Sequence, residues 1–150
     1  MPLFGLRFAA PVPVETVRWL GLSGETYPDR KKGGIFGWHQ ERPHIPAYLV
    51  PQECGCHMDT HVASLQMPDG TKLTLEMADA PFAFSAIPYT PQQLEQAAHL
   101  EELPQPVRTV VTIYGAMRGV GGIDSWGSDV ESAYQVHGEQ DMGFSFLIHL

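Results

Sequence analysis

The sequence predicts an all-β protein, an antiparallel β-sandwich that carries one short helix. Short segments in which apolar and polar residues alternate recur along the 150 residues and are separated by turn residues. The 13 prolines and 15 glycines are dispersed, which indicates frequent turns. One segment carries the start signals of a helix, and strands do not alternate with helices as they do in parallel sheets. Together these observations favour two packed antiparallel sheets.

The first part of the chain is predicted to form two strands and then a long ordered loop. Residues 4–9 and 15–22 alternate partly with period two, so that Val17 and Trp19 share one face. We expect Trp19 to lie in the core. From residue 27 to residue 51, prolines, glycines and aromatic residues follow one another without sustained periodicity. In this loop Trp38 is expected to act as an anchor or to line a surface cleft.

The middle of the chain carries a clear hairpin signal. Residues 57–67 mix apolar and polar side chains in a strand-like manner, and residues 72–77 alternate strictly. Asp69 and Gly70 between them supply a tight turn. A further short strand is expected around Phe82 and Phe84.

One helix is predicted after residue 90. Thr90 provides an N-cap hydroxyl, Pro91 suits the first helical position and Gln93 completes a capping box. The helical run is expected over residues 94–100, and Pro104 and Pro106 end it. Three later segments then read as strands, namely residues 107–116, 130–136 and 144–150.

Length and charge limit the classes of function. A chain of 150 residues without an evident linker predicts a single domain, 1–150. Nine basic against 17 acidic residues give a net charge of −8, which excludes nucleic acid as an expected partner. The amino-terminal residues resemble neither a signal peptide nor a membrane span, so a cytoplasmic protein is expected.

The most informative loop runs from Met117 to Asp129. It contains four glycines, which let the backbone approach a ligand closely, and one large aromatic residue, Trp126. The flat face of an indole can stack on a sugar ring, while Asp124 and Ser125 can meet its hydroxyls. Packing of Trp126 into the end of the sandwich is the alternative, and the residues alone favour it.

Four motifs resemble the last domain of family 2 β-galactosidases, in the same order. They are residues 19–30, residues 51–53 before Gly55, residues 88–94 with His99, and the Gly-Gly-Ile-Asp-Ser-Trp-Gly sequence of residues 121–127. The wording of the last motif is most similar to the small subunit of the enzymes of lactic acid bacteria. Many relatives have two consecutive acids in this motif, whereas this chain has Ile123 and Asp124.

The resemblance implies a galactose-mutarotase-like supersandwich, of which this chain would be the carboxyl-terminal half. It implies hydrolysis of terminal β-D-galactosides such as lactose, with Trp126, Asp124 and Ser125 as substrate-binding residues. The catalytic glutamates would lie on a large chain or barrel domain, the expected partner in a homo- or hetero-oligomer. No catalytic residue and no cofactor are expected here, since the Mg and the Na or K of complete enzymes bind elsewhere. A stand-alone carbohydrate-binding sandwich or an assembly domain is the alternative.

A metal site is the rival reading of one short cluster. Cys54, Cys56, His57, Asp59 and His61 offer soft and borderline ligands within eight residues. The spacing does not match common zinc motifs, and on a strand the cysteines and histidines would face opposite sides. We therefore expect free thiols and no metal.

The acids Glu53, Asp59 and Asp129 are expected at the surface, in caps or in turns. None of them sits in a motif that resembles the catalytic ones of the family.

Overall fold

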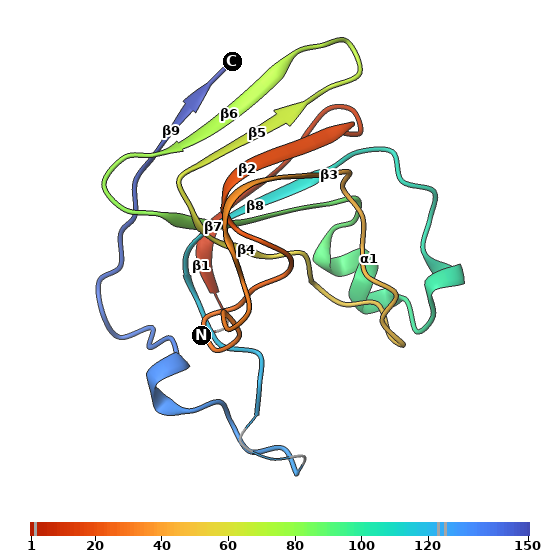
Figure 1. The fold of residues 1–150 in the computed structure, drawn as a ribbon. Helices are drawn as coiled ribbons and strands as arrows, with labels where there is room; N and C mark the ends of the chain where they lie inside the picture. Colours follow the sequence, from red (N-terminus) through yellow and green to blue (C-terminus); the bar gives the residue numbers. More distant parts are fainter. Residues whose placement is uncertain (2, 123, 125) are drawn as a thin grey trace.

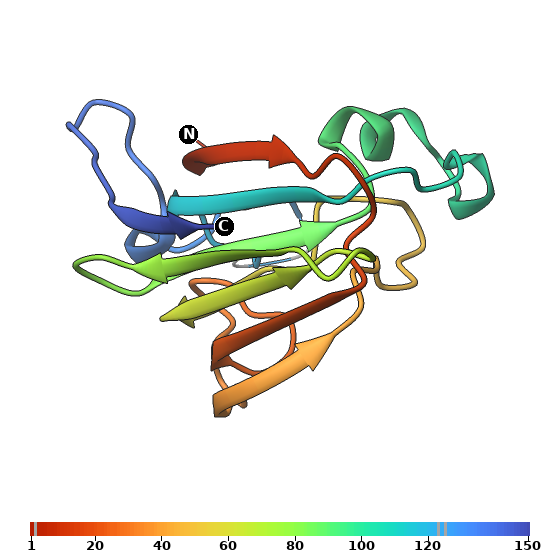
Figure 2. The same ribbon diagram turned by 90° about the horizontal axis from the view of Figure 1, so that it is seen from above.

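Two antiparallel sheets form the body of the protein, as the sequence predicts (Figure 1). The computed structural model describes residues 1, 3–122, 124 and 126–150. In this part of the chain one sheet has the strand order β1-β8-β7-β4 and the other the order β3-β2-β5-β6-β9. The view from above shows that most strands of the two sheets run along a common direction (Figure 2). The elements are β1 (Leu3–Ala9), β2 (Thr16–Leu22), β3 (Phe36–Glu41), β4 (His57–Thr60), β5 (Val62–Gln66), β6 (Lys72–Met77), β7 (Phe82–Ile87), α1 (Pro91–Gln96), β8 (Val110–Met117) and β9 (Phe146–His149).

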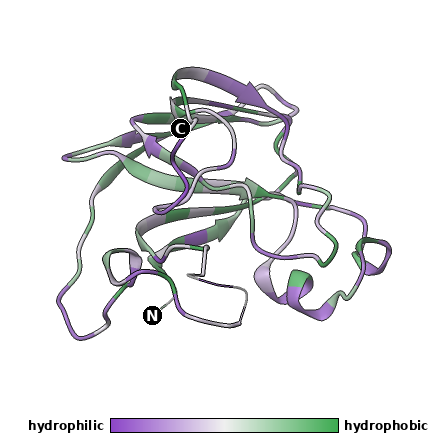
Figure 3. Cartoon of the chain, turned by 60° about the horizontal axis from the view of Figure 1, so that its bottom comes forward, coloured by the Kyte–Doolittle hydropathy of each residue, from purple (hydrophilic) through white to green (hydrophobic). Residues whose placement is uncertain are grey.

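The main core lies between the two sheets. Trp19 is buried there, as expected, and its ring meets the ring of Phe84 edge-on at 6.3 Å. Alternate residues of each strand point into this layer, and Figure 3 shows the resulting mixture of hydrophobic and hydrophilic residues along the strands. The buried members of this core include Val17, Trp19, Ala63, Leu65, Leu73, Leu75, Phe82, Phe84, Ala86, Val111 and Ile113.

The two sheets differ in how their other faces are covered. Every residue of β7 is buried, because loops and α1 cover the far side of the four-stranded sheet. There Ile87 packs with Leu94 of α1, and Tyr114 packs with Cys56. The outer face of the five-stranded sheet is instead open over β3, where Phe36 and Trp38 are about half exposed.

The strand β3 corrects the prediction of an uninterrupted loop from residue 27 to residue 51. It pairs along its whole length with β2, at the edge of the five-stranded sheet. Its outward residues, Phe36, Trp38 and Gln40, are exposed, while Gly37 and His39 face inward. Because the outward side is partly apolar and the inward side partly polar, the period-two signal is lost.

The sequence predicts one strand-like segment from residue 57 to residue 67, whereas the structure divides this segment between the two sheets. β4 pairs with β7, whereas β5 pairs with β2 and β6. Asp59 has a φ of 52°, a left-handed conformation that bends the chain, and β5 follows after His61. The predicted hairpin of β5 and β6 is confirmed.

The prediction of a strand over residues 130–136 is wrong. The segment contains a 3-10 turn, Ser132–Tyr134, instead. The Gln135 side chain donates to the Val130 carbonyl at 3.0 Å, and the Tyr134 carbonyl accepts from Gly119 N at 2.9 Å. Together with the hydrogen bond from Tyr134 N to the Glu131 carbonyl at 2.8 Å, these bonds engage backbone groups of the segment without a neighbouring strand.

The capping box at Thr90 is confirmed, although the helix is shorter than expected. Thr90 Oγ1 accepts from Gln93 N at 3.2 Å, and Gln93 Oε1 accepts from Thr90 N at 2.9 Å. The helix ends at Gln96 because Ala97 is already extended, and Leu100 begins a separate 3-10 turn. Among the described residues no helix has the length and apolar character needed to cross a bilayer.

Candidate functional site

The glycine-rich loop after β8 extends away from the two sheets, below them in Figure 1. Trp126 lies in this loop with 91 % of its surface exposed. The alternative in which this indole packs into the end of the sandwich is therefore wrong. An indole that this chain leaves in solvent is available to a ligand or to a partner.

Asp124 organises the turn that presents Trp126. Its carboxylate accepts hydrogen bonds from Trp126 N at 2.8 Å and from the Ser128 hydroxyl at 2.8 Å. These hydrogen bonds, of which the one from Ser128 has the largest effect, hold the pKa of Asp124 below its ordinary value. The acid is thus ionised and already engaged within the loop. The third predicted residue, Ser125, lies outside the described residues.

The base of the loop is held by a residue about 90 positions earlier in the chain. Asp29 accepts from Val120 N at 3.0 Å and from Gly121 N at 2.7 Å. Partial burial acts to raise the pKa of Asp29, but these hydrogen bonds and the positive charge of Arg30 outweigh it and lower the pKa. The carboxylate therefore acts as a charged clamp, which we call the Asp29 clamp.

Two glycines make the Asp29 clamp possible. A Cβ on Gly119 would lie 2.8 Å from Asp29 Cγ, and a Cβ on Gly121 would lie 2.9 Å from Asp29 Oδ2. Both distances are shorter than a side chain tolerates, so the absence of a side chain allows the acid to reach the backbone amides.

A second carboxylate, Glu25, ties the neighbouring loops together. It accepts hydrogen bonds from the Tyr27 hydroxyl, from the Tyr48 hydroxyl at 2.7 Å and from Gly55 N at 2.8 Å. The hydrogen bond to Glu25, ahead of burial, raises the pKa of Tyr48 to about 12. Burial and the same acid also raise the pKa of Tyr27. Both phenols stay protonated near neutral pH and remain donors.

Two hollows lie beside the base of the loop and share Tyr27, Glu53 and Val120 in their walls. The sulfur-lined hollow has a volume of about 290 Å³, and its further walls include Cys54, Cys56, Tyr114 and Met117. The polar hollow has a volume of about 400 Å³, and its further walls are Arg30, Tyr48 and Gln52. Their shared walls make them neighbours at the end of the sandwich from which the loop departs.

Comparison with known proteins decides the family. Residues 1–148 match the model of the family described as "Beta galactosidase small chain". The chain belongs to this family. The resemblance stated from the motifs is thereby confirmed over almost the whole chain.

The relatives of this small-chain family member are longer than it is. The β-galactosidase small subunit of Latilactobacillus sakei is 52 % identical over 99 % of the chain, which spans 50 % of that protein. The β-galactosidase BgaC of Bifidobacterium adolescentis is 34 % identical, and a β-galactosidase of Halalkalibacterium halodurans is 33 % identical. Each aligns with 99 % or more of the chain, which spans 15 % of either relative. The chain thus covers half or less of these proteins.

Each of the three acids predicted to lie at the surface, in caps or in turns forms an ion pair. Glu53 pairs with Arg7, and Asp129 pairs with Arg118. Asp59 accepts from Lys31 Nζ at 2.7 Å. Glu53 and Asp129 are exposed, as predicted, whereas Asp59 lies within β4 and has a partly exposed side chain. Such partly exposed pairs contribute little to stability.

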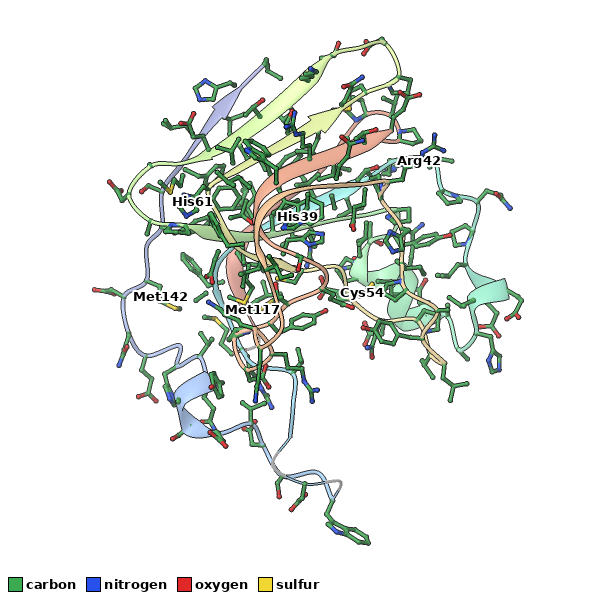
Figure 4. All side chains as sticks on the ribbon, in the orientation of Figure 1. His39, Arg42, Cys54, His61, Met117 and Met142 are labelled. Carbon is green, nitrogen blue, oxygen red and sulfur yellow. The ribbon has the colours of Figure 1, made fainter. Side chains whose placement is uncertain are left out.

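The rival cluster of cysteines and histidines does not converge. Figure 4 shows Cys54 and His61 well apart, and among the described residues no three groups of the His, Cys, Asp and Glu types gather as ligands would. Both ring nitrogens of His57 already have partners, because Nδ1 contacts the Gly24 carbonyl at 2.9 Å and Nε2 contacts Glu41 Oε1 at 3.2 Å. Both cysteines are buried free thiols, as expected.

Sequence reasoning missed the residues that hold the loop. Asp29 and Glu25 lie in the first of the four motifs, residues 19–30, but nothing in their spacing indicates which amides they bind. The glycines of the loop were the available signal, because closely spaced glycines permit the approach of some other group. Identifying that group as Asp29 requires the tertiary structure.

Proposed function

We propose that the chain is the part of a β-galactosidase that contacts the galactoside through Trp126, while the catalytic glutamates lie on a large chain or barrel domain. One observation carries the proposal: an indole that is 91 % exposed stands on a loop whose base is fixed by the Asp29 clamp. A firmly based aromatic surface is what stacking on a pyranose requires, because ordering the binder beforehand reduces the entropy lost on binding. Terminal β-D-galactosides such as lactose are the proposed substrates.

The division of labour follows from chemistry. A retaining glycosidase needs two carboxyl groups about 5 Å apart on either side of the scissile bond. The acids around this loop, Asp29, Asp124 and Asp129, are bound to amides, hydroxyls or guanidinium groups. They are thereby committed to building the loop, which supports placing hydrolysis on the partner. The Mg and the Na or K of complete enzymes would likewise bind outside this chain.

Substrate contact would use the loop as follows. Trp126 offers its ring face to the C–H groups of the sugar, and Asp124 keeps the turn in the conformation that presents this ring. Ser125 remains a proposed contact to a sugar hydroxyl. Closure of the partner's active site by the loop would exclude water from the scissile bond and strengthen the electrostatic interactions there.

Assembly is the second candidate function, and the outer face of the five-stranded sheet favours it. Phe36 lies opposite Leu22, and Trp38 lies opposite Leu20, which in turn lies opposite Val62. These outward side chains form an apolar stripe across three strands at an open sheet edge. An apolar stripe of this kind favours contact with another part of the enzyme.

The experiment mixes the chain with a β-galactosidase large chain that lacks this region and follows hydrolysis of a chromogenic galactoside. Wild-type chain is expected to restore activity. When the chain is present at saturating concentration, Trp126→Ala is expected to lower kcat/KM by about 30-fold. This corresponds to a loss of about 2 kcal/mol of binding free energy, which is typical of a buried anchor residue. Trp38→Ala, a second exposed tryptophan, is the control, since any deficit it causes in assembly is overcome by adding more chain.

The outcomes separate the two candidate functions. Equal activity of wild type and Trp126→Ala in a demonstrated complex would contradict the sugar contact, and assembly would then be the remaining candidate function. Failure to restore activity despite complex formation would contradict the catalytic partnership altogether.

A further inference from the structure

The polar hollow beside the base of the loop carries hydrogen-bonding groups that no other described residue engages. Its wall includes Arg30 and Gln52, both of which are exposed. Within the described part of the chain, neither side chain takes part in an ion pair or in a hydrogen bond. A guanidinium offers several N–H donors, and an amide both donates and accepts. The volume of about 400 Å³ falls in the range of small-molecule sites, about 300–1,000 Å³.

The aromatic walls of the polar hollow are held in place by the chain itself. The hydroxyls of Tyr27 and Tyr48 both donate to Glu25, so one carboxylate fixes the two tyrosine side chains. Arg30 N donates to the Tyr27 carbonyl at 2.8 Å, which ties the arginine backbone to the same tyrosine. Because these walls are ordered before a ligand arrives, less entropy is lost on binding.

The polar hollow is also joined to the Asp29 clamp. Val120 in its wall donates its N–H to Asp29 at 3.0 Å. Arg30 Nη2 lies so close to Gly121 that a Cβ on this glycine would come within 2.7 Å of it. The contacts that hold the base of the loop therefore also position the guanidinium.

The charges around the polar hollow favour a neutral ligand. The guanidinium of Arg30 and the carboxylate of Asp29 both lie against Gly121, so their charges largely offset each other. Glu53 in the wall is paired with Arg7, and both oxygens of Glu25 already accept hydrogen bonds, so these acids are not available to a cation. The net charge of −8 on the chain disfavours an anion.

We propose that the polar hollow binds one neutral hexose unit, with Arg30 and Gln52 as its hydrogen-bonding residues. A pyranose is uncharged, and its hydroxyls both donate and accept, which matches a guanidinium together with an amide. The tyrosine side chains supply aromatic surface for its C–H groups. The choice of a sugar among neutral polar ligands rests on the proposed function, but this site requires neither Trp126 nor the large chain.

Titration of the chain with methyl β-D-galactoside, followed through the amide chemical shifts, tests the site. Wild type is expected to show saturable shifts at Gln52, Glu53 and Val120. Gln52→Ala should weaken binding by about threefold to tenfold, because a hydrogen bond to the ligand is lost. Gln40→Ala is the matched control and should bind as wild type does, since Gln40 is an exposed glutamine of β3 outside the hollow.

Arg30→Lys tests the second hydrogen-bonding residue. This variant keeps a positive charge beside Asp29 but loses the planar arrangement of donors, so binding should weaken by about threefold or more. An affinity equal to that of wild type would remove the guanidinium from the site.

The methyl β-D-galacturonide tests the charge of the ligand, because it has the same ring with a carboxylate at C6. It is expected to bind at least about threefold more weakly than the galactoside, since like charges near Glu25 repel it. Equal or tighter binding of the galacturonide would overturn the assignment to a neutral ligand.

Trp126→Ala separates this site from the contact at the tip of the loop. The saturable shifts at Gln52 and Val120 should persist in this variant. Binding that is lost in Trp126→Ala and undiminished in Gln52→Ala would overturn the inference and would support the proposed function, because the sugar would then lie at the tip. Absence of saturable shifts at the hollow in wild type would also overturn the inference, while the activity test with the large chain would stand. Thermal melting of each variant separates loss of the site from loss of the fold.

Discussion

The base and the tip of the glycine-rich loop are held in different ways. The base is joined to distant parts of the chain, because Asp29 binds Val120 and Gly121 across about 90 residues. The tip is organised by contacts within the loop, from Asp124 to Trp126 and to Ser128. The difference teaches that this chain fixes where the loop starts but leaves the indole at its tip exposed.

The largest expected effect concerns the loops that support the base. Glu25→Ala removes the acceptor of the Tyr27 and Tyr48 hydroxyls and of Gly55 N. We expect the free energy of unfolding to fall by about 3 kcal/mol, because three polar groups lose their partner in partly buried positions. Urea denaturation of wild type, Glu25→Ala and Glu25→Gln measures it. A value for Glu25→Ala within error of wild type would remove Glu25 from the account of the base.

A smaller effect is expected at the clamp itself. Asp29→Ala removes two hydrogen bonds from backbone amides at a largely solvated carboxylate, so the free energy of unfolding should fall by about 1 kcal/mol after allowance for solvent screening. Asp29→Asn retains one acceptor oxygen, so its free energy of unfolding is expected to lie between those of wild type and Asp29→Ala. Amide hydrogen exchange of Val120 and Gly121 should speed up in Asp29→Ala. Unchanged exchange would show that the base is held by other contacts.

The clamp also predicts a dependence on pH. The pKa of Asp29 is lower in the folded chain than its ordinary value, so its contribution is fully present above about pH 4 and is lost as the pH falls through the folded pKa. The difference in unfolding free energy between wild type and Asp29→Asn should therefore shrink below pH 4. A difference that stays constant from pH 6 to pH 3 would contradict a charged clamp.

The smallest effect on stability is expected at the tip. Trp126→Ala removes a side chain that is 91 % exposed, so the free energy of unfolding should change by less than about 0.5 kcal/mol. Thermal and urea denaturation of the chain alone measure it beside Asp29→Ala. A loss larger than that of Asp29→Ala would mean that the indole packs on this chain, and would reverse the distinction between base and tip.

The sequence by itself determined the parts that depend on local chemistry. The capping box at Thr90 and the hairpin of β5 and β6 follow from short patterns, because side chains within three or four residues satisfy the backbone there. The buried position of Trp19 likewise follows from alternation along β2. The motif around Trp126 also pointed correctly to the β-galactosidase small-chain family.

Tertiary structure alone decided the features that join distant segments. No short-range pattern predicts that Asp29 binds the amides of Val120 and Gly121. Nor does one predict that Cys56 and Met117, which are 61 positions apart in the sequence, lie in contact. The division of residues 57–67 between two sheets is of the same kind, since each half is strand-like and only the partners differ. Short-range patterns report which backbone conformation is favourable, whereas the choice of partner depends on the packing of the whole chain.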